Sequence, residues 1–350
     1  MKDNPIRFAA IGLDHRHIYG MSQGMIDAGG EFVAFWSEGD PQPLEGFKKR
    51  FPDVARVAGL AQLLEDPTID LVLIAAPPAA RADLALQAMR HGKDVMLDKP
   101  GCLSAAELHE IEACIAQTGR IWSVNFSERF EVASATLVDQ LLAENRIGKV
   151  VQTLSMAPHR LNAQMRPDWF WDRTAYGGIL GDIGTHQIDQ FLHFTGAQNA
   201  EIAYATVGNF NAPHHPRFED FGEINLVAGD VQGYARLDWF TPDAAPNWGD
   251  GRLTILGTEG YIEVRKYFDV CAQPGTDHVF LVNGTECQRF DAANAGTPYF
   301  ARLAGDIRNR TETACPQHHT IAVMRLAIKA QAKAVRRGHL SNTDQAKARH

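Results

Sequence analysis

The stretch "AAIGLDHRHIYGM", residues 9–21, decides the fold of the first part of the chain. An apolar run leads into Gly12 and then into residues that can begin a helix, which is how a dinucleotide-binding domain opens. Such a turn usually carries two further glycines, whereas Asp14 and His17 stand at their positions. A carboxylate about 4 Å from a phosphate would oppose it by about 4 kcal/mol at an effective dielectric of about 20. Two interpretations therefore stay open: the loop binds the pyrophosphate of a nucleotide, or it has lost that function.

Short apolar runs alternate with helical patterns up to about residue 125. The runs are IRFAAIGL, EFVAFWS, IDLVLIAAP, KDVMLDKP and RIWSVNF. Continuous apolar runs of this length are typical of parallel strands that are buried on both faces, and their alternation with helices predicts a doubly wound, Rossmann-type sheet. Because ligands bind at the carboxyl ends of such strands, the candidate residues follow the runs, at 12–17, 37–40, 77–81, 98–102 and 125–129.

The pattern changes after about residue 150 to longer alternating strands with few helices between them. This indicates an α+β domain with a large open, mostly antiparallel sheet. Helical periodicity is expected over 177–195 and again over 317–337. The predicted fold is therefore α/β, with an N-terminal Rossmann domain over 1–127 and a C-terminal α+β domain over 128–350.

Composition excludes several classes of function. A chain of 350 residues with 45% hydrophobic and 22% charged residues is typical of a globular protein of two domains. The net charge of −8 argues against nucleic-acid or membrane partners and favours a small polar substrate. Five scattered cysteines without a CxxC spacing indicate neither disulfides nor a zinc site. Because no apolar run is long enough to span a membrane, we expect a cytoplasmic protein.

The first two turns of the predicted sheet point to a nicotinamide cofactor. Arg16, with His15 and His17, can compensate the charge of Asp14 beside Gly12. A metal site at His15 and His17 is the alternative, but we predict none, because positions i and i+2 do not share a helix face. After the second run, Ser37 and Glu38 stand where an acid would bind the ribose hydroxyls of NAD, and no Arg or Lys follows in the sequence. NAD is therefore favoured, with NADP as the alternative.

The stretch "YGGILGDIGTHQIDQFLHF", 176–194, carries the strongest candidates for chemistry. On a helix, Asp182, His186, Asp189 and His193 would fall within roughly 60° of one another, flanked by apolar residues. A carboxylate one turn from an imidazole can orient it as a general acid and base. Lys99, which follows Asp98 at the end of a buried strand, can stabilise a developing alkoxide there.

Several motifs in this order resemble the glucose–fructose oxidoreductase and inositol dehydrogenase (Gfo/Idh/MocA) family over nearly the whole chain. They are the turn at Gly12, AAPP at 75–78, DKP at 98–100, ERF at 128–130, GGILGDIGTHQID at 177–189 and ILGTEGYIEV at 255–264. The chain departs from the family pattern at three positions. Tyr176 replaces the first glycine of GGG, Asp98 replaces a glutamate, and Arg81 stands where many members have a histidine.

The resemblance implies NAD(P)-dependent oxidoreduction of sugars, polyols or related compounds by a homodimer or homotetramer. By position, Lys99, Asp182 and His186 match the catalytic lysine, aspartate and histidine of the family. The expected cofactor-binding residues are Gly12, Asp14, His15, Arg16, His17, Ser37, Glu38, Pro77, Arg81, Asp98 and Lys99. The expected substrate-binding residues are His159, Arg160, Trp169, Asp182 and His186.

Three other functions stay open at this point. One is a lyase or glycoside hydrolase in which the cofactor is oxidised and reduced again in each cycle. Another is a sugar-binding or regulatory relative that has lost the cofactor, which is suggested by Asp14 because its carboxylate would oppose a phosphate. The last is a divalent-metal enzyme that uses Asp182, His186 and Asp189.

Overall fold

The chain forms two compact units in the computed structural model, which describes residues 4–267, 269, 271 and 273–340. The first unit comprises residues 1–126 and 298–324, and the second comprises 127–297 and 325–350. The segment 298–324 thus differs from its expected place in the second domain. It belongs to the first unit because helix α11 (Tyr299–Asn309) packs on helix α1 (His17–Asp27), with the Phe300 ring lying against Gly24.

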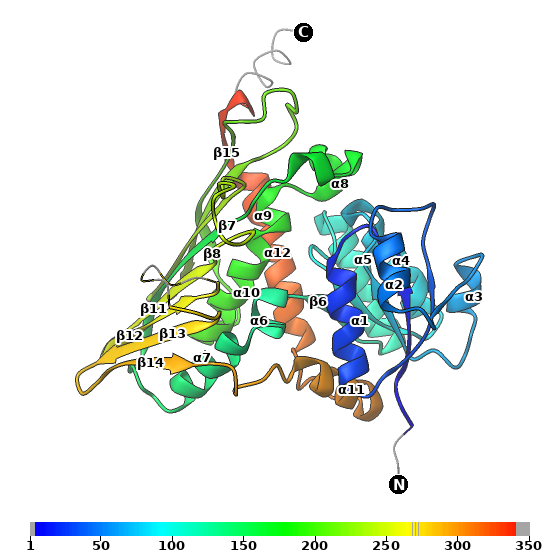
Figure 1. Ribbon diagram of the computed structural model, residues 1–350, viewed down its shortest axis with the longest axis horizontal. Helices are drawn as coiled ribbons and strands as arrows, with labels where there is room; N and C mark the ends of the chain where they lie inside the picture. The colour runs from blue at the N-terminus through cyan, green and yellow to red at the C-terminus, as the bar shows by residue number, and fades with distance from the viewer. Residues whose placement is uncertain (1–3, 268, 270, 272, 341–350) are drawn as a thin grey trace. The chain divides into compact units, whose positions relative to one another are not determined.

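The first unit is the predicted doubly wound sheet (Figure 1). Six parallel strands lie in the order β3-β2-β1-β4-β5-β6. They are β1 (Arg7–Ile11), β2 (Glu31–Trp36), β3 (Ala55–Arg56), β4 (Leu71–Ile74), β5 (Asp94–Asp98) and β6 (Trp122–Asn125). The other helices are α2 (Leu44–Arg50), α3 (Ala61–Leu64), α4 (Pro78–Arg90) and α5 (Ala105–Thr118). Strands β4, β5 and β6 are buried along their whole length, which explains why they read as unbroken apolar runs.

The second unit is built on a mostly antiparallel sheet, also as predicted. Nine strands lie in the order β14-β13-β12-β11-β7-β10-β9-β8-β15, and only the β7–β10 and β8–β15 pairs are parallel. They are β7 (Val150–Pro158), β8 (Glu201–Asn209), β9 (Phe221–Ala228), β10 (Val231–Asp238), β11 (Arg252–Gly257), β12 (Gly260–Arg265), β13 (His278–Asn283), β14 (Cys287–Asp291) and β15 (Val335–Gly338).

Helices cover one face of this sheet, and no helix of the described residues covers the other (Figure 1). They are α6 (Ser127–Phe130), α7 (Ala133–Ala143), α8 (Arg173–Tyr176), α9 (Ile179–Asp182), α10 (Gly184–Thr195) and the end of α12 (Gln317–Lys333), with short 3-10 turns at Ala163–Met165 and Asp168–Trp171. Apolar residues of the covered face, among them Ile255 and Ile262, form a buried core with α7.

Two predicted helices differ from the structure. The single helix expected over 177–195 is interrupted at Ile183, between α9 and α10. The terminal helix ends at Lys333 rather than 337, because Val335–Gly338 adds a parallel strand to β8. No described helix has both the length and the apolar character needed to cross a bilayer.

Candidate functional site

The predicted cofactor residues gather at the carboxyl edge of the six-stranded sheet. The segments 12–17, 37–40, 75–78 and 98–100 follow β1, β2, β4 and β5, which are neighbouring parallel strands. The carboxyl ends of parallel strands meet at one edge, and this is where ligands of doubly wound folds bind. Pro77 lies at this edge as the residue before α4.

The first turn requires its glycine. Gly12 has a φ of +71°, and a Cβ there would lie 2.6 Å from Ala76. The amides of Asp14 and His15 both donate to the carbonyl of Ala75, at 3.0 and 3.1 Å, so the turn is tied to the end of β4. Arg16 exposes its guanidinium directly before α1. The turn therefore combines the close backbone approach of a nucleotide loop with an exposed cation for a phosphate.

Asp14 differs electrostatically from an ordinary surface aspartate. Burial raises the pKa of its carboxyl from 3.8 to about 6, Arg81 opposes that rise, and Glu38 adds to it. The carboxyl consequently takes up a proton more readily than an exposed aspartate would. Proton uptake removes the negative charge that would oppose a phosphate.

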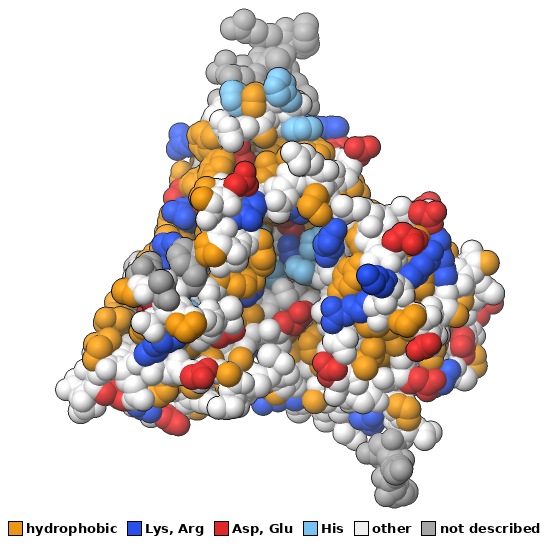
Figure 2. Space-filling model, in the orientation of Figure 1, with side chains coloured by type: hydrophobic (Ala, Val, Ile, Leu, Met, Phe, Trp, Pro, Cys, Tyr) orange, Lys and Arg blue, Asp and Glu red, His pale blue; other side chains and the backbone are white. Residues whose placement is uncertain are grey.

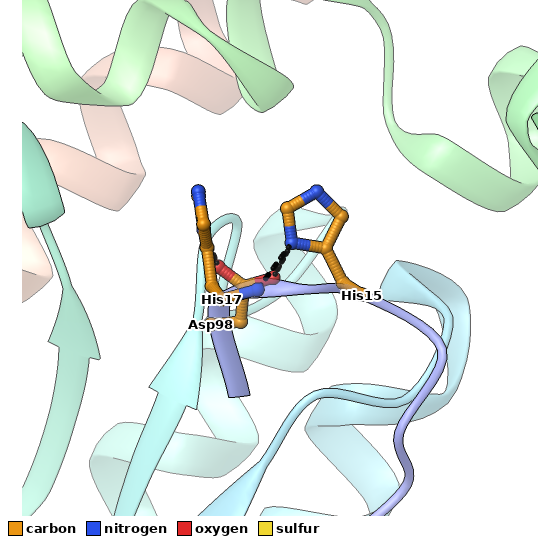
Figure 3. Close-up of side chains that lie close together, drawn as sticks. All are labelled: His15, His17 and Asp98. Atoms are coloured by element: carbon orange, nitrogen blue, oxygen red, sulfur yellow. Dashed lines mark hydrogen bonds and ion pairs between the residues drawn. The ribbon is translucent and has the colours of Figure 1, made fainter. Parts of the chain in front are cut away.

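The carboxylate of Asp98 ties the turn to the end of β5 (Figure 3). Its Oδ1 accepts from His17 Nδ1 at 2.7 Å and from the Lys99 amide at 2.8 Å. Its Oδ2 lies 2.8 Å from His15 Nδ1 and accepts from Arg81 Nη2 at 3.0 Å. Burial alone would raise the pKa of the Asp98 carboxyl, but the two imidazoles and the guanidinium hold that pKa well below its usual range. The ionised carboxylate only accepts, so both imidazoles carry their proton on Nδ1.

The imidazole of His15 is neutral at neutral pH. Burial lowers its pKa to about 4, although the charge of Asp98 acts in the opposite direction. With its proton on Nδ1, a neutral imidazole offers a lone pair on Nε2. Nε2 of His15 therefore accepts a hydrogen bond or binds a cation, and it does not donate to a phosphate.

Arg81, which was predicted to bind the cofactor, makes its hydrogen bonds inside the first unit. Its side chain is fully buried and donates to the carbonyls of Ala76, Lys99 and Pro100 as well as to Asp98. The guanidinium thus fixes the Asp98–Lys99 segment from inside the unit.

The turn after β2 holds a cation that the local sequence does not reveal. Ser37 is buried and donates to the carbonyl of Gly39 at 3.2 Å, whereas Glu38 is exposed. Arg56, on β3, pairs with Asp40 at 2.8 Å and donates to the carbonyl of Gly39. The absence of a basic residue after the second apolar run therefore does not mean that this turn lacks a cation.

The candidate catalytic residues Asp182 and His186 lie on consecutive helices of the second unit. Asp182 ends α9, and His186 lies in the first turn of α10, where it is buried. Glu219 anchors the start of α9, because its carboxylate accepts from the Ile179 amide at 2.9 Å. Tyr176, the residue in place of a family glycine, is buried, and its hydroxyl accepts from the Glu219 amide at 3.0 Å.

Two residues of the polar stripe expected on one helix, Asp189 and His193, have different partners in the structure. Asp189 is buried and accepts two hydrogen bonds from Arg129, at 2.8 and 2.6 Å. His193 pairs with Asp139 at 2.7 Å near the surface. Asp189 is therefore already neutralised by a guanidinium, which disfavours the metal centre with Asp182 and His186 that the sequence left open.

A cavity of about 40 Å³ opens within the second unit, with space for a few water molecules or one hydroxymethyl group. Glu128 and Lys266 line it and form an ion pair at 2.8 Å. Burial alone would raise the pKa of Glu128, but Lys266, followed by His186, lowers it to about 2. Gln187 is buried in the cavity wall, and its Oε1 has no hydrogen-bond partner among the described residues.

The predicted substrate residues are placed differently from one another. His159 lines the cavity beside Trp248, with their ring centroids 4.6 Å apart. Arg160 instead donates to the carbonyls of Pro242, Asp243 and Ala245, so it holds a loop. Trp169 is half-buried in the 3-10 turn before α8. The sequence did not single out Lys266 as a residue of this cavity. For Glu128, the ERF motif at 128–130 was a signal that could have pointed to it.

Comparison with known proteins extends over both units. The profile described as an oxidoreductase family with an NAD-binding Rossmann fold matches residues 6–126, and that of the GFO/IDH/MocA C-terminal domain matches residues 136–263. The scyllo-inositol 2-dehydrogenase (NAD(+)) of Bacillus subtilis (strain 168) is 26% identical over 271 residues, which are 74% of each chain.

Solved structures agree with these matches. A crystal structure from Erwinia carotovora atroseptica SCRI1043, classed as an oxidoreductase, is 45% identical with a TM-score of 0.92, covering 95% of this chain and 100% of that one. Levoglucosan dehydrogenase, solved with NADH and levoglucosan, shares the fold at 17% identity and a TM-score of 0.74, covering 94% and 98% of the two chains. With a nucleotide-type turn in one unit, an open sheet in the other and a matching profile for each, this chain belongs to the GFO/IDH/MocA family of NAD(P)-dependent oxidoreductases.

Proposed function

We propose that the protein interconverts a secondary alcohol and a ketone on a sugar, a polyol or a similar compound. The observation that carries the proposal is the match to the family in both halves of the chain. Lys99, Asp182 and His186 support it as the residues that the resemblance assigns to the family's catalytic positions. The names of relatives support the substrate class, since they include a scyllo-inositol dehydrogenase and a levoglucosan dehydrogenase.

Each of these residues has a proposed task. In the direction of oxidation, the imidazole of His186 takes the hydroxyl proton, and Asp182 orients that imidazole or binds a neighbouring hydroxyl. Lys99 stabilises the alkoxide by its charge. When bound, the oxidised nicotinamide would accept the hydride that leaves the carbon atom of the alcohol. The fit of the chain to that cofactor rests on the turn at Gly12, with its close backbone approach, and on the exposed Arg16.

The cavity beside Glu128 is the proposed place for a substituent of the substrate. Glu128 and the Oε1 of Gln187 both accept hydrogen bonds, as a hydroxyl group requires. The ammonium of Lys266 lies 5.4 Å from the Trp248 ring and 5.0 Å from the Tyr267 ring, which fixes the cation at the cavity wall. A polar substituent with at least one hydroxyl hydrogen matches these groups.

We propose NAD as the preferred nucleotide. The exposed Glu38 after β2 would bind ribose hydroxyls and repel a 2′-phosphate. Arg56 is the cation in the described residues of this turn that could favour NADP, but its guanidinium is paired with Asp40. Release of that ion pair would be the first step of NADP binding.

The uncovered face of the nine-stranded sheet is the proposed contact between subunits of a homodimer or homotetramer. Four apolar or aromatic side chains project from this face with 38–42% of their surface exposed, namely Leu154, Tyr204, Leu256 and Tyr261. Hydrophobic side chains are spread along the outer margin of the sheet (Figure 2). Exposed apolar side chains gathered on one face are typical of an interaction surface.

A reducing, cytoplasmic location is likewise proposed, supported by five cysteines without disulfides.

The test is a fluorescence titration with NADH and with NADPH, followed by a screen of polyols and sugars with the nucleotide that binds. We expect saturable NADH binding and NADH production from NAD with at least one polyol. His186→Asn should lower turnover by a factor of about 100 or more while nucleotide affinity stays unchanged, and His193→Asn, on the same helix, is the control. Absence of binding by both nucleotides would refute the proposal, and retained cofactor without net NADH production would indicate the lyase or hydrolase instead.

A further inference from the structure

Three potential metal ligands converge at the first turn of the nucleotide unit, and the sequence argument against them does not hold in the structure. One ligand atom each from His15, His17 and Asp98 lie within 4.8 Å of one another. Figure 3 shows both imidazoles directed at the same carboxylate. The i, i+2 objection applied to a helix, but α1 begins at His17, and His15 lies in the turn before it. We propose that His15, His17 and Asp98 form a binding site for a divalent transition-metal ion of the Zn²⁺ and Co²⁺ type.

The donor set determines the class of ion. Two imidazole nitrogens with one carboxylate oxygen suit Zn²⁺, Co²⁺, Ni²⁺ or Fe²⁺, whereas Mg²⁺ and Ca²⁺ prefer sites made of oxygen atoms. Three protein ligands leave a coordination position for water. The side chains of His15 and His17 are 24% and 31% exposed, whereas that of Asp98 is buried, so an ion would enter from the side of the two imidazoles.

The hydrogen bonds seen in the structure are compatible with this role. The distances from the Asp98 carboxylate oxygens to the imidazole Nδ1 atoms, 2.7 and 2.8 Å, are those of ordinary hydrogen bonds to a carboxylate, so the two nitrogens already converge on one group. On binding, the ion would take the Nδ1 lone pair of each imidazole in place of its hydrogen bond to Asp98, with the ring proton then carried on Nε2.

The surrounding hydrogen bonds hold the Asp98 carboxylate in a position from which it could bind a metal ion. Asp98 is fully buried, and its position is fixed by the Lys99 amide and by Arg81. A ligand held in place by a second set of hydrogen bonds loses little freedom on binding a metal. Arg81 also neutralises part of the carboxylate charge, so we expect binding at micromolar concentrations rather than the much tighter binding of structural zinc sites.

The experiment uses the full-length protein without a histidine tag, after treatment with EDTA, and titrates it with Co²⁺. Visible absorption of bound Co²⁺ and calorimetry give the stoichiometry and affinity. His15→Asn and His17→Asn are the decisive variants, because the asparagine amide keeps a donor to Asp98 near the position of Nδ1 but removes the ligand. His91→Asn replaces an exposed histidine of the same unit and is the matched control.

We expect one Co²⁺ per chain in the parent protein and in His91→Asn, and a loss of affinity of at least about tenfold in each of the two decisive variants. Circular dichroism and the thermal midpoint show that these variants are folded. Absence of saturable binding up to millimolar Co²⁺, or equal binding by the parent and both variants, overturns the inference. NADH titration of the EDTA-treated protein is a separate readout, so failure of the metal site and failure of the proposed oxidoreductase function are distinguishable.

Discussion

Replacing Glu219 with Gln should make the protein's stability less dependent on pH. Glu219 is 1% exposed, and burial raises the pKa of its carboxyl from 4.5 to about 7. Its hydrogen bonds from the Ile179 amide and from Gln331 oppose that rise. The raised pKa means that ionisation of this carboxyl costs more in the folded state than in the unfolded state.

The magnitude follows from the two pKa values. Below pH 4.5 the carboxyl is protonated in both states and contributes no difference. Between 4.5 and about 7 the folded protein binds more protons than the unfolded chain, so its free energy of unfolding falls as the pH rises. The loss amounts to about 3 kcal/mol, at about 1.4 kcal/mol for each pH unit in that interval. The amide introduced by Glu219→Gln does not titrate, so the variant does not lose this stability as the pH rises. From pH 4.5 to pH 8, the free energy of unfolding of the variant should therefore increase by about 3 kcal/mol relative to that of the parent.

The assay is urea unfolding followed by circular dichroism at several pH values between 4.5 and 8. The quantity compared is the pH dependence of the difference in free energy of unfolding between variant and parent. A packing effect of the substitution that does not depend on pH cancels from this comparison. Glu201→Gln, an exposed residue on β8, is the control and should show no such trend. A difference for Glu219→Gln that varies by less than about 0.5 kcal/mol over this range would refute the assignment of a raised pKa.

Three further predictions concern other parts of the chain. Glu128→Gln leaves the largely buried ammonium of Lys266 without its carboxylate partner and should lower the free energy of unfolding by about 3 kcal/mol. In urea unfolding, the double variant with Lys266→Met should recover most of that loss. Arg56→Ala should weaken NADPH binding and leave NADH binding unchanged, and an equal effect on both nucleotides would contradict the place given to Arg56. Leu154→Lys should reduce the mass in light scattering to that of a monomer, whereas the same substitution at the exposed Glu201 should not.

The sheets could be predicted because their signals are local. The buried parallel strands read as apolar runs, and the alternating strands of the second unit show which side chains face the helices. The return of α11 to the first unit and the strand Val335–Gly338 could not be predicted in this way, because each depends on packing against a distant segment. The interruption at Ile183 lies within a stretch whose apolar periodicity looks continuous in the sequence.

Side-chain partners from distant segments limited the prediction of the site. Asp189 looked available on a helical stripe, but Arg129, sixty residues away, binds it with two hydrogen bonds. Lys266 reaches Glu128 across 138 residues, and Arg56 reaches the turn after β2 from the next strand. Spacing along one helix or one loop indicates which groups are near each other locally, but it does not indicate which of them are already paired.

The departures from the family pattern in the nucleotide unit are best explained as one set. His17 in place of a glycine, Arg81 in place of a histidine and Asp98 in place of a glutamate look unrelated in the sequence, yet all three meet at the Asp98 carboxylate. A glutamate at position 98 would carry its carboxylate one methylene further from β5 and could not keep these contacts unchanged. Of the two residues that stand at the glycine positions, His17 therefore has partners of its own, because it belongs to a polar cluster with the end of β5. Such a cluster favours a turn with a retained task over a turn that has lost its function.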